Sequence, residues 1–270
     1  SLSLPMCLSP TQRDPEILLQ VFTYVQLMKI DYNQPDDDFG DASARMTRAV
    51  FAEGVERAVL LMRHSAREYR RDVHDLENPL TAEGRSLAAR FGAALPDVNL
   101  RGYSSPVTRC RDTGALALEA STAAQRGGVI SKVRDIEAFG VFYALDQIRM
   151  WKGLRESAGL ADYVGQWFAG EVHQSAMMRP QRAVAMVLEV MLDKLNAPAI
   201  QAGAPQLDLC VTHDMTIFTM RHGAGLEPVT GPDVKFMDGL LMYERDGQVF
   251  FASQHGGIVE VDEALMGYAR

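Results

Sequence analysis

The sequence predicts an α/β protein, a three-layer α/β/α sandwich around a mostly parallel central sheet, with an antiparallel C-terminal hairpin strand and a small inserted cap. Three observations predict this fold class. From residue 57 onward, short apolar runs alternate with amphipathic segments, which is the pattern of strands connected by helices. The run "AVLLM" (58–62) is apolar at every position, as expected of a strand buried on both faces. Residues 234–254 form two segments around Asp246-Gly247, a pair that favours a hairpin turn.

The first 56 residues predict a helical extension in front of a main domain at 57–270. Residues 12–31 carry apolar side chains at helical spacing after a proline at the first turn, and an Asp-rich loop follows them. Ser43 is a candidate N-cap for a short helix that runs through Phe51. The apolar face of 17–28 would either complete a homodimer or cover the sheet.

The main domain is expected to begin with a strand and to alternate from there. Expected strands lie at 58–62, 100–106, 129–139 and 207–214, and expected helices at 80–95, 107–121, 179–197 and from 215 onward. Thr81 is a candidate N-cap for the helix at 80–95. Residues 140–178 carry both tryptophans and interrupt the alternation, so they predict the cap.

The composition is ordinary for a soluble globular enzyme: 47% of the 270 residues are hydrophobic and 23% are charged. A net charge of −8 argues against general binding to nucleic acid or anionic membranes, because both need a basic face. Three well-separated cysteines do not form a disulfide framework and favour a reducing, cytoplasmic compartment. The first ten residues lack the regions of a signal peptide, although an earlier leader stays open, and no apolar run reaches the roughly 18 residues of a membrane span.

Polar side chains follow three of the expected strands at the points where those strands end. In an open α/β sheet, ligands bind outside the carboxyl ends of the strands. Six side chains would therefore meet in one crevice: Arg63, His64, Arg67, Arg109, His213 and Asp214. A neutral imidazole can attack phosphorus, arginines bind the equatorial oxygens, and a carboxylic acid can protonate the leaving oxygen. This set of side chains predicts phosphoryl transfer through a phosphohistidine.

A second Arg-His pair, Arg221 and His222, fails the same test. It falls about two turns into the helix expected after "THD" (212–214), and helix-ending glycines follow it. Cationic side chains in a last helical turn are favoured by the helix dipole. His222 is therefore expected to be structural.

Four motifs resemble those of the histidine phosphatase (phosphoglycerate mutase-like) superfamily. "LLMRHSAR" is similar to its Arg-His-x-x-Arg signature, "NPLTAEGRSLA" (78–88) to its "LTxxGxxQA" helix start, and "YSSPVTRCRDTG" (103–114) to its "SSPxxRxxxTA" segment. "THDMTIFTMRHGAGL" (212–226) resembles the His-Asp helix of the acid phosphatase branch, and "VKFMDGLLMYE" (234–244) the strand that follows it there. The resemblance covers roughly residues 57–255, and it favours the acid phosphatase branch.

The resemblance implies a role for each motif residue. His64 would be the nucleophile that becomes phosphorylated. Asp214 would be the general acid, as in the acid phosphatase branch; in the mutase branch that acid is a glutamate after the third strand, and Glu137 lies near there. The phosphate would be held by Arg63, Arg67 and Arg109, with His213 as a further donor.

Two departures from the family pattern affect the predicted site. The usual glycine after the catalytic histidine is Ser65, whose hydroxyl would either bond phosphate or crowd the pocket. The family's proline beyond the second arginine is absent from "REYRRD" (67–72).

The function predicted from the sequence is a metal-independent phosphomonoester hydrolase that acts on a small phosphorylated substrate and releases inorganic phosphate. Two alternatives stay open: a mutase-like phosphotransferase, and a phosphate- or partner-binding module on a retired scaffold. No cofactor is expected, because no phosphate-loop or dinucleotide fingerprint occurs. A metal is not expected either, because the remaining histidines, at 74, 173, 222 and 255, lack the spacing of metal ligands. The cap is expected to determine which substrate binds.

Overall fold

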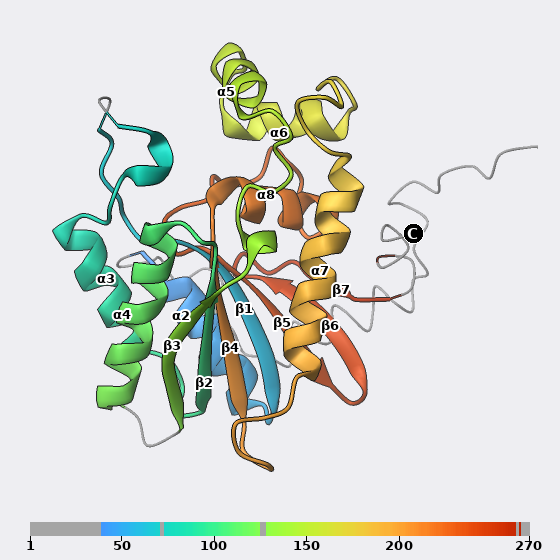
Figure 1. The fold of residues 1–270 in the computed structure, drawn as a ribbon. Coiled ribbons are helices and arrows are strands. Elements are labelled where there is room, and N and C mark those ends of the chain that lie inside the picture. The colour runs from blue at the N-terminus through green and yellow to red at the C-terminus, as the bar shows by residue number, and fades with distance from the viewer. Residues whose placement is uncertain (1–38, 71–72, 125–127, 263–264, 266–270) are drawn as a thin grey trace, which may run out of the picture.

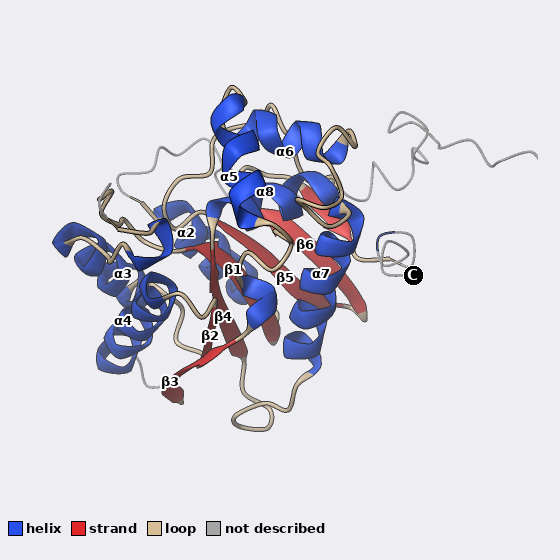
Figure 2. Cartoon of the chain, turned by 45° about the horizontal axis from the view of Figure 1, so that its top comes forward, coloured by secondary structure: helices blue, strands red, loops and turns tan. Residues whose placement is uncertain are grey.

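The computed structural model of the chain describes residues 39–70, 73–124, 128–262 and 265. The helix expected at 12–31 lies outside the described residues. Within them, a seven-stranded sheet forms the centre and helices cover both of its faces (Figures 1 and 2). The three-layer α/β/α class expected from the sequence is confirmed.

The sheet has the strand order β3-β2-β4-β1-β5-β6-β7. Its strands are β1 (Arg57–Arg63), β2 (Asn99–Ser104), β3 (Val129–Asp135), β4 (Gln206–Thr212), β5 (Gly239–Arg245), β6 (Gln248–Ser253) and β7 (Ile258–Glu260). The first four strands are parallel, whereas β5, β6 and β7 each run antiparallel to their neighbours. The predicted hairpin is confirmed, because β5 and β6 are joined by Asp246 and Gly247, both with positive φ (52° and 78°). The edge strand β7 was not predicted.

The helices follow the predicted alternation. They are α2 (Asp41–Ala52), α3 (Ala82–Ala93), α4 (Thr108–Ala124), α5 (Gln147–Glu156), α6 (Leu160–Phe168), α7 (Pro180–Asn196) and α8 (Asp214–Gly223), with short 3₁₀ turns η2 (Asp75–Glu77) and η3 (Glu137–Phe139). Thr81 caps α3 as expected, because its hydroxyl accepts a hydrogen bond from the Gly84 amide at 2.9 Å. The predicted role of Ser43 is wrong: α2 begins after Gly40, and Ser43 lies buried within its first turn. Its hydroxyl is used in tertiary contacts, with the Met237 carbonyl at 2.8 Å and the Gln254 side chain at 2.7 Å.

Alternate side chains of β1 point into two separate cores, one on each face of the sheet. Val59 and Leu61 belong to the core under α7 and α8, whereas Leu60 and Met62 belong to the core under α2, α3 and α4. All four side chains are fully buried. Strand side chains alternate between faces, so a strand covered by helices on both sides must be apolar at every position. This explains the unbroken apolar run that predicted the strand.

The cap lies over the carboxyl ends of the parallel strands (Figure 1). Its helix α6 buries Tyr163, Val164 and Trp167 in the same core that packs against α7 and α8. The indole N–H of Trp167 donates to the Met178 carbonyl at 2.7 Å, which ties α6 to the segment that enters α7. The cap is therefore packed into the main core and is not a separate folding unit.

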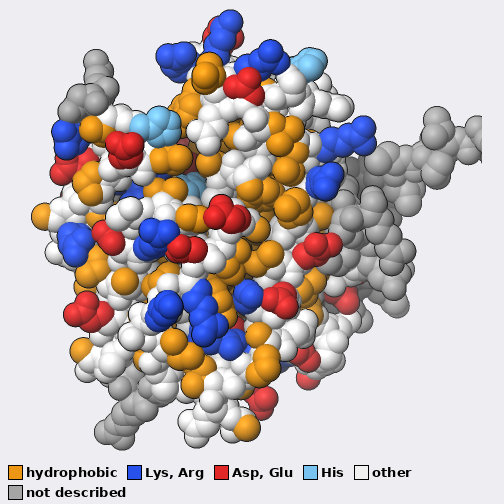
Figure 3. All heavy atoms as spheres, in the orientation of Figure 1, with side chains coloured by type: hydrophobic (Ala, Val, Ile, Leu, Met, Phe, Trp, Pro, Cys, Tyr) orange, Lys and Arg blue, Asp and Glu red, His pale blue; other side chains and the backbone are white. Residues whose placement is uncertain are grey.

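Helix α5 is the exposed part of the cap. Only Met150 is buried on it, and Ile148 is 83% exposed. Basic side chains gather at the top of the molecule where α5 lies (Figure 3); those of α5 are Arg149, Lys152 and Arg155. None of the helices among the described residues is long and apolar enough to cross a membrane.

Candidate active site

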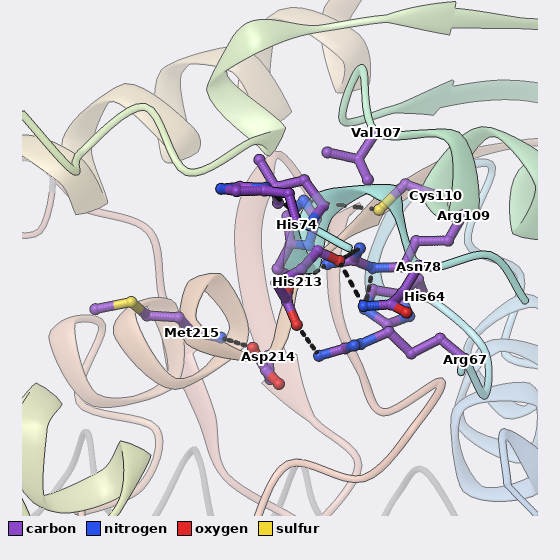
Figure 4. A network of polar contacts seen from close by, with 12 residues as sticks. His64, Arg67, His74, Asn78, Val107, Arg109, Cys110, His213, Asp214 and Met215 are labelled. Carbon is purple, nitrogen blue, oxygen red and sulfur yellow. Dashed lines mark hydrogen bonds and ion pairs between the residues drawn. The ribbon is translucent and has the colours of Figure 1, made fainter. Parts of the chain in front are cut away.

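The carboxyl ends of three adjacent parallel strands bring the predicted site residues together (Figure 4). Strand β1 ends at Arg63 and is followed by His64; β4 ends at Thr212 and is followed by His213 and Asp214; β2 leads into Arg109 in the first turn of α4. The His64 amide donates to the Thr212 carbonyl at 2.9 Å, so the sheet pairing extends to the nucleophile candidate itself. Loops follow rigid strands at this edge, and the side chains on them are therefore held in place.

His64 is 2% exposed, and both of its ring nitrogens have partners. Nδ1 lies 2.8 Å from the Ser65 carbonyl, and Nε2 accepts a hydrogen bond from Nε of Arg109 at 3.0 Å. Because a carbonyl can only accept, Nδ1 carries the proton and Nε2 keeps an unprotonated lone pair, which accepts the hydrogen bond from Arg109. Burial lowers the pKa of His64 well below 6.5, and the charge of Arg109 and the neighbouring His213 lower it further. The ring is thus neutral at physiological pH, with its unprotonated nitrogen at Nε2.

His213 is the second buried imidazole of the site, and its ring centroid lies 5.7 Å from that of His64. Its Nε2 lies 2.9 Å from the hydroxyl of Ser105. Burial lowers the pKa of His213 to about 3, with a further lowering from Arg109, while Asp214 acts in the opposite direction. The thiol of Cys110 also lies beside this ring, at 3.7 Å, but burial raises the pKa of Cys110 to about 12, so it stays protonated.

Arg63 is held by contacts on several sides. Nη2 pairs with Oδ2 of Asp214 at 2.9 Å, and Nη1 donates to the Val234 carbonyl at 2.7 Å. Its guanidinium carbon lies 4.2 Å from the ring centroid of Phe236, a distance typical of a cation–π contact. Nε is buried without a hydrogen-bond partner among the described residues. Residues 234–238, predicted as the start of a strand, instead form the loop that supplies these contacts.

Arg67 and Arg109 share one carboxylate, that of Asp75. Nη2 of Arg67 lies 2.7 Å from Oδ1, and Nη2 of Arg109 lies 3.4 Å from Oδ2. Nε of Arg67, like that of Arg63, is buried without a partner among the described residues. Buried N–H donors without partners are rare in proteins, and they are consistent with a site built to receive an anion.

The charges of the site favour an anionic ligand in a chain that is acidic overall. Three arginines face the two carboxylates of Asp75 and Asp214, so the cluster keeps a net positive charge while both histidines are neutral. Arginine forks placed in a buried crevice are suited to phosphate. The local field therefore has the sign opposite to that of the whole chain.

Asp75 is the site residue that the sequence reasoning missed. It lies in η2, within the long loop between β1 and α3, where no periodic pattern assigns a direction to any side chain. The sequence between these two elements contains three other acidic residues, at positions 68, 72 and 77, and nothing in it says which carboxylate turns toward the arginines. The one available signal was an acidic residue shortly before the α3 cap motif.

The two candidates for the general acid lie in different surroundings. Asp214 is the first residue of α8, pairs with Arg63, and accepts a hydrogen bond from the Met215 amide at 2.8 Å. Glu137 lies in η3, where its side chain is exposed, and it takes part in none of the contacts described for the site. The geometry favours Asp214.

The hydroxyl of Ser65 points away from the predicted anion site. Its proton is donated to the Gly84 carbonyl at 2.7 Å, and its amide donates to the hydroxyl of Thr113 at 3.1 Å. A Cβ on Gly84 would lie 2.0 Å from the Ala66 carbonyl oxygen, so only glycine allows α3 to approach this turn. The structure thus places Ser65 in the support of the His64 turn, where we predicted a phosphate contact.

The second Arg-His pair lies in the last turn of α8, as expected. Arg221 is 2% exposed, pairs with Glu227 at 3.2 Å and donates to the Pro232 carbonyl. The ring of His222 packs edge-on against Phe168, with centroids 4.7 Å apart. Both residues hold the loop after α8 and the cap, and neither takes part in the contacts that hold His64.

Within the part of the chain that the structure describes, no group of three or more His, Cys, Asp or Glu side chains is arranged to hold a metal ion.

Residues 59–127 match the family model described as the histidine phosphatase superfamily (branch 1). The resemblance to this superfamily is confirmed. The matching segment runs from β1 through α4 and contains His64, Arg67 and Arg109. Since the match is to branch 1, the closer likeness to the acid phosphatase branch stays a prediction.

Solved structures that the chain resembles include YhfR from Bacillus stearothermophilus, which is 19% identical over 73% of this chain and 96% of that one, with a TM-score of 0.48. A phosphoglycerate mutase from Bacillus anthracis is 17% identical over 80% of this chain and 99% of that one, with a TM-score of 0.48. A phosphoserine phosphatase from Entamoeba histolytica is 16% identical over 76% and 95%, with a TM-score of 0.43. None of the curated protein sequences matches the chain.

Proposed function

We propose that the chain is a phosphomonoester hydrolase that works through a phosphohistidine at His64. The observation that carries this proposal is the state of the His64 ring: it is neutral, its Nδ1 proton is fixed by a carbonyl, and Nε2 faces Arg109. A nucleophile needs an unprotonated lone pair beside groups that bind the reacting phosphorus oxygens. His64 meets both requirements.

In the first step, the Nε2 lone pair attacks phosphorus and the bond from phosphorus to the ester oxygen breaks. Arg63, Arg67 and Arg109 bind the non-bridging oxygens, where charge gathers in the transition state. Asp214 donates its proton to the leaving oxygen, which departs as an alcohol.

In the second step, water attacks the phosphohistidine and gives a proton to Asp214. The bond from phosphorus to nitrogen breaks, the electron pair returns to Nε2, and inorganic phosphate leaves. The net reaction converts a phosphomonoester and water into an alcohol and phosphate, and it needs no metal or organic cofactor. Small phosphorylated molecules that fit beneath the cap are the proposed substrates.

Leaving-group dependence provides a sharp test of the general acid. Asp214→Asn should slow hydrolysis of an alkyl phosphate by roughly 10²–10⁴-fold, because an alkoxide needs its proton during departure. Hydrolysis of p-nitrophenyl phosphate should slow far less, because nitrophenolate is a good leaving group. Glu137→Gln is the matched control, and we expect it to retain the wild-type rate on both substrates. If Glu137→Gln slowed hydrolysis of the alkyl phosphate and Asp214→Asn did not, the general acid would be Glu137.

The nucleophile is tested by the same assay in the presence of EDTA. His64→Ala should abolish turnover, whereas His222→Ala should retain it, since His222 packs against the cap. Loss of activity only on changing His222 would contradict the proposal. Wild-type protein that binds phosphate without turning over any monoester would favour a binding module.

A further inference from the structure

The carboxylate of Asp75 occupies the two arginines that the proposed mechanism assigns to phosphate. Its oxygens lie 2.7 Å from Nη2 of Arg67 and 3.4 Å from Nη2 of Arg109. Its main-chain carbonyl also accepts from Nη1 of Arg109 at 2.8 Å, while Nε of Arg109 donates to His64. All three nitrogens of Arg109 are thus engaged, and one of them covers the nucleophilic lone pair. In this arrangement neither Arg109 nor Nε2 of His64 is free to meet an anion.

The main chain around Asp75 is anchored, but its carboxylate is not locked in. The loop closes where the Glu68 amide donates to the Pro79 carbonyl at 2.9 Å. Inside it, Asn78 is 2% exposed, accepts from the Arg70 amide at 2.9 Å and donates to the Asp75 carbonyl at 3.4 Å. The Asp75 side chain itself is 30% exposed. Rotation of this side chain toward solvent therefore requires no opening of the loop.

We propose that Asp75 is a specificity-determining residue: it holds the place of the phosphate on Arg67 and Arg109, and a ligand must displace it in order to bind. This inference rests on the proposed function only in that both take these arginines as the phosphate site. A carboxylate brings one negative charge and two oxygens, whereas a phosphomonoester dianion brings two charges and three free oxygens. The dianion therefore displaces the Asp75 carboxylate from the arginines, whereas a singly charged anion such as a phosphodiester or a carboxylate does not.

Displacement also prepares the nucleophile. Once the carboxylate leaves, Nη2 of Arg109 loses its partner, and Arg109 exchanges its hydrogen bond to the Asp75 carbonyl for bonds to the incoming anion. Its Nε then leaves Nε2 of His64, and the lone pair becomes free to attack phosphorus. Binding of the correct anion and exposure of the nucleophile are thus coupled through one side chain, Asp75.

The test is the affinity for inorganic phosphate, measured by titration calorimetry near pH 8 at constant ionic strength, where the dianion dominates. Asp75→Asn keeps the shape of the side chain and removes its charge. We expect it to bind phosphate at least about tenfold more tightly than the wild type, and to bind dimethyl phosphate, a monoanion, where the wild type does not. Asp75→Ala should show the same tightening. The matched control is Glu77→Gln, an exposed carboxylate on the same turn, which should leave both affinities unchanged.

Turnover supplies a second readout that a merely structural role would not produce. In Asp75→Asn, KM for p-nitrophenyl phosphate should fall and inorganic phosphate should become a stronger product inhibitor. Unchanged or weaker phosphate binding in Asp75→Asn would overturn the inference, because it would make Asp75 a support for the arginines.

The failures of the two proposals are distinguishable. Tighter phosphate binding by Asp75→Asn, in a protein that hydrolyses no monoester, would refute the proposed function and support the inference. Weaker binding by Asp75→Asn, in an active enzyme, would refute the inference alone. If neither the wild type nor Asp75→Asn bound phosphate, both proposals would fall.

Discussion

Burial of a neutral histidine in the site should make the protein less stable in mild acid, by an amount that follows from the pKa of His213. In the folded chain this pKa is lowered to about 3 by burial and by Arg109. In the unfolded chain the imidazole has its ordinary pKa of about 6.5. Above pH 6.5 neither state binds the proton, so the full stability is present. Below it the unfolded state gains a proton that the folded state refuses, and stability is lost as the pH falls toward 3.

The size of the loss can be worked out for the interval from pH 7 to pH 5. Over this range the unfolded chain protonates His213 almost completely, while the folded chain does not. Linkage at about 1.4 kcal/mol per pH unit below 6.5 gives a loss of about 2 kcal/mol from this one residue. The interval lies above the ordinary pKa values of aspartate and glutamate, about 3.9 and 4.3, so their contribution is small there. His64, whose pKa is also lowered by burial, adds a loss of the same sign.

The assay is urea unfolding at pH 7, 6 and 5, followed by the fluorescence of Trp167 and Trp151. The glutamine in His213→Gln cannot titrate. Between pH 7 and pH 5, the wild type should therefore lose about 2 kcal/mol more free energy of unfolding than this variant. His173→Gln, which removes an exposed imidazole from the loop before α7, is the matched control for loss of a histidine. If His213→Gln and the wild type lost stability in parallel, His213 would not be held neutral in the folded protein, and the electrostatic account of the site would be wrong.

Two further substitutions test the supports of the site. Arg221→Met should lower the free energy of unfolding by about 3–5 kcal/mol, because it leaves Glu227 buried without its cation. A loss below 1 kcal/mol in urea unfolding would contradict this role. Ser65→Ala should cost about 1–2 kcal/mol, since the Gly84 carbonyl loses its buried donor. Undiminished stability together with weaker phosphate binding would show instead that the hydroxyl of Ser65 faces the anion, as the sequence predicted.

The elements with strong local signals were predicted well. Thr81 begins α3 as a capping residue, and Asp246-Gly247 makes the hairpin turn, because each depends on backbone geometry within a few residues. The role of Ser43 could not be predicted from neighbouring residues. Its hydroxyl is a normal helix cap by type, yet it bonds Met237 and Gln254, about 200 residues away in the sequence. Tertiary partners decided its role.

The candidate site divides in the same way. Arg63, His64, Arg109, His213 and Asp214 could be placed at one edge from sequence, because parallel strands end at the same side of a sheet and these residues follow strand ends directly. Whether Ser65 faces the pocket could not be known, since one rotation about its Cα–Cβ bond moves the hydroxyl from the anion site to Gly84. The choice between Asp214 and Glu137 likewise needed their positions in space.

What the sequence alone determined is the order of strands and helices, the two-sided burial of the central strands, and the set of residues at their carboxyl ends. These follow from the periodicity of apolar side chains and from the chemistry of short motifs, both of which are local. Only the tertiary structure decided that Asp75 lies between Arg67 and Arg109, and that Arg109 covers Nε2 of His64. Those contacts depend on how side chains turn within a loop without periodicity and on how that loop packs against the start of α4, and neither leaves a pattern in the sequence.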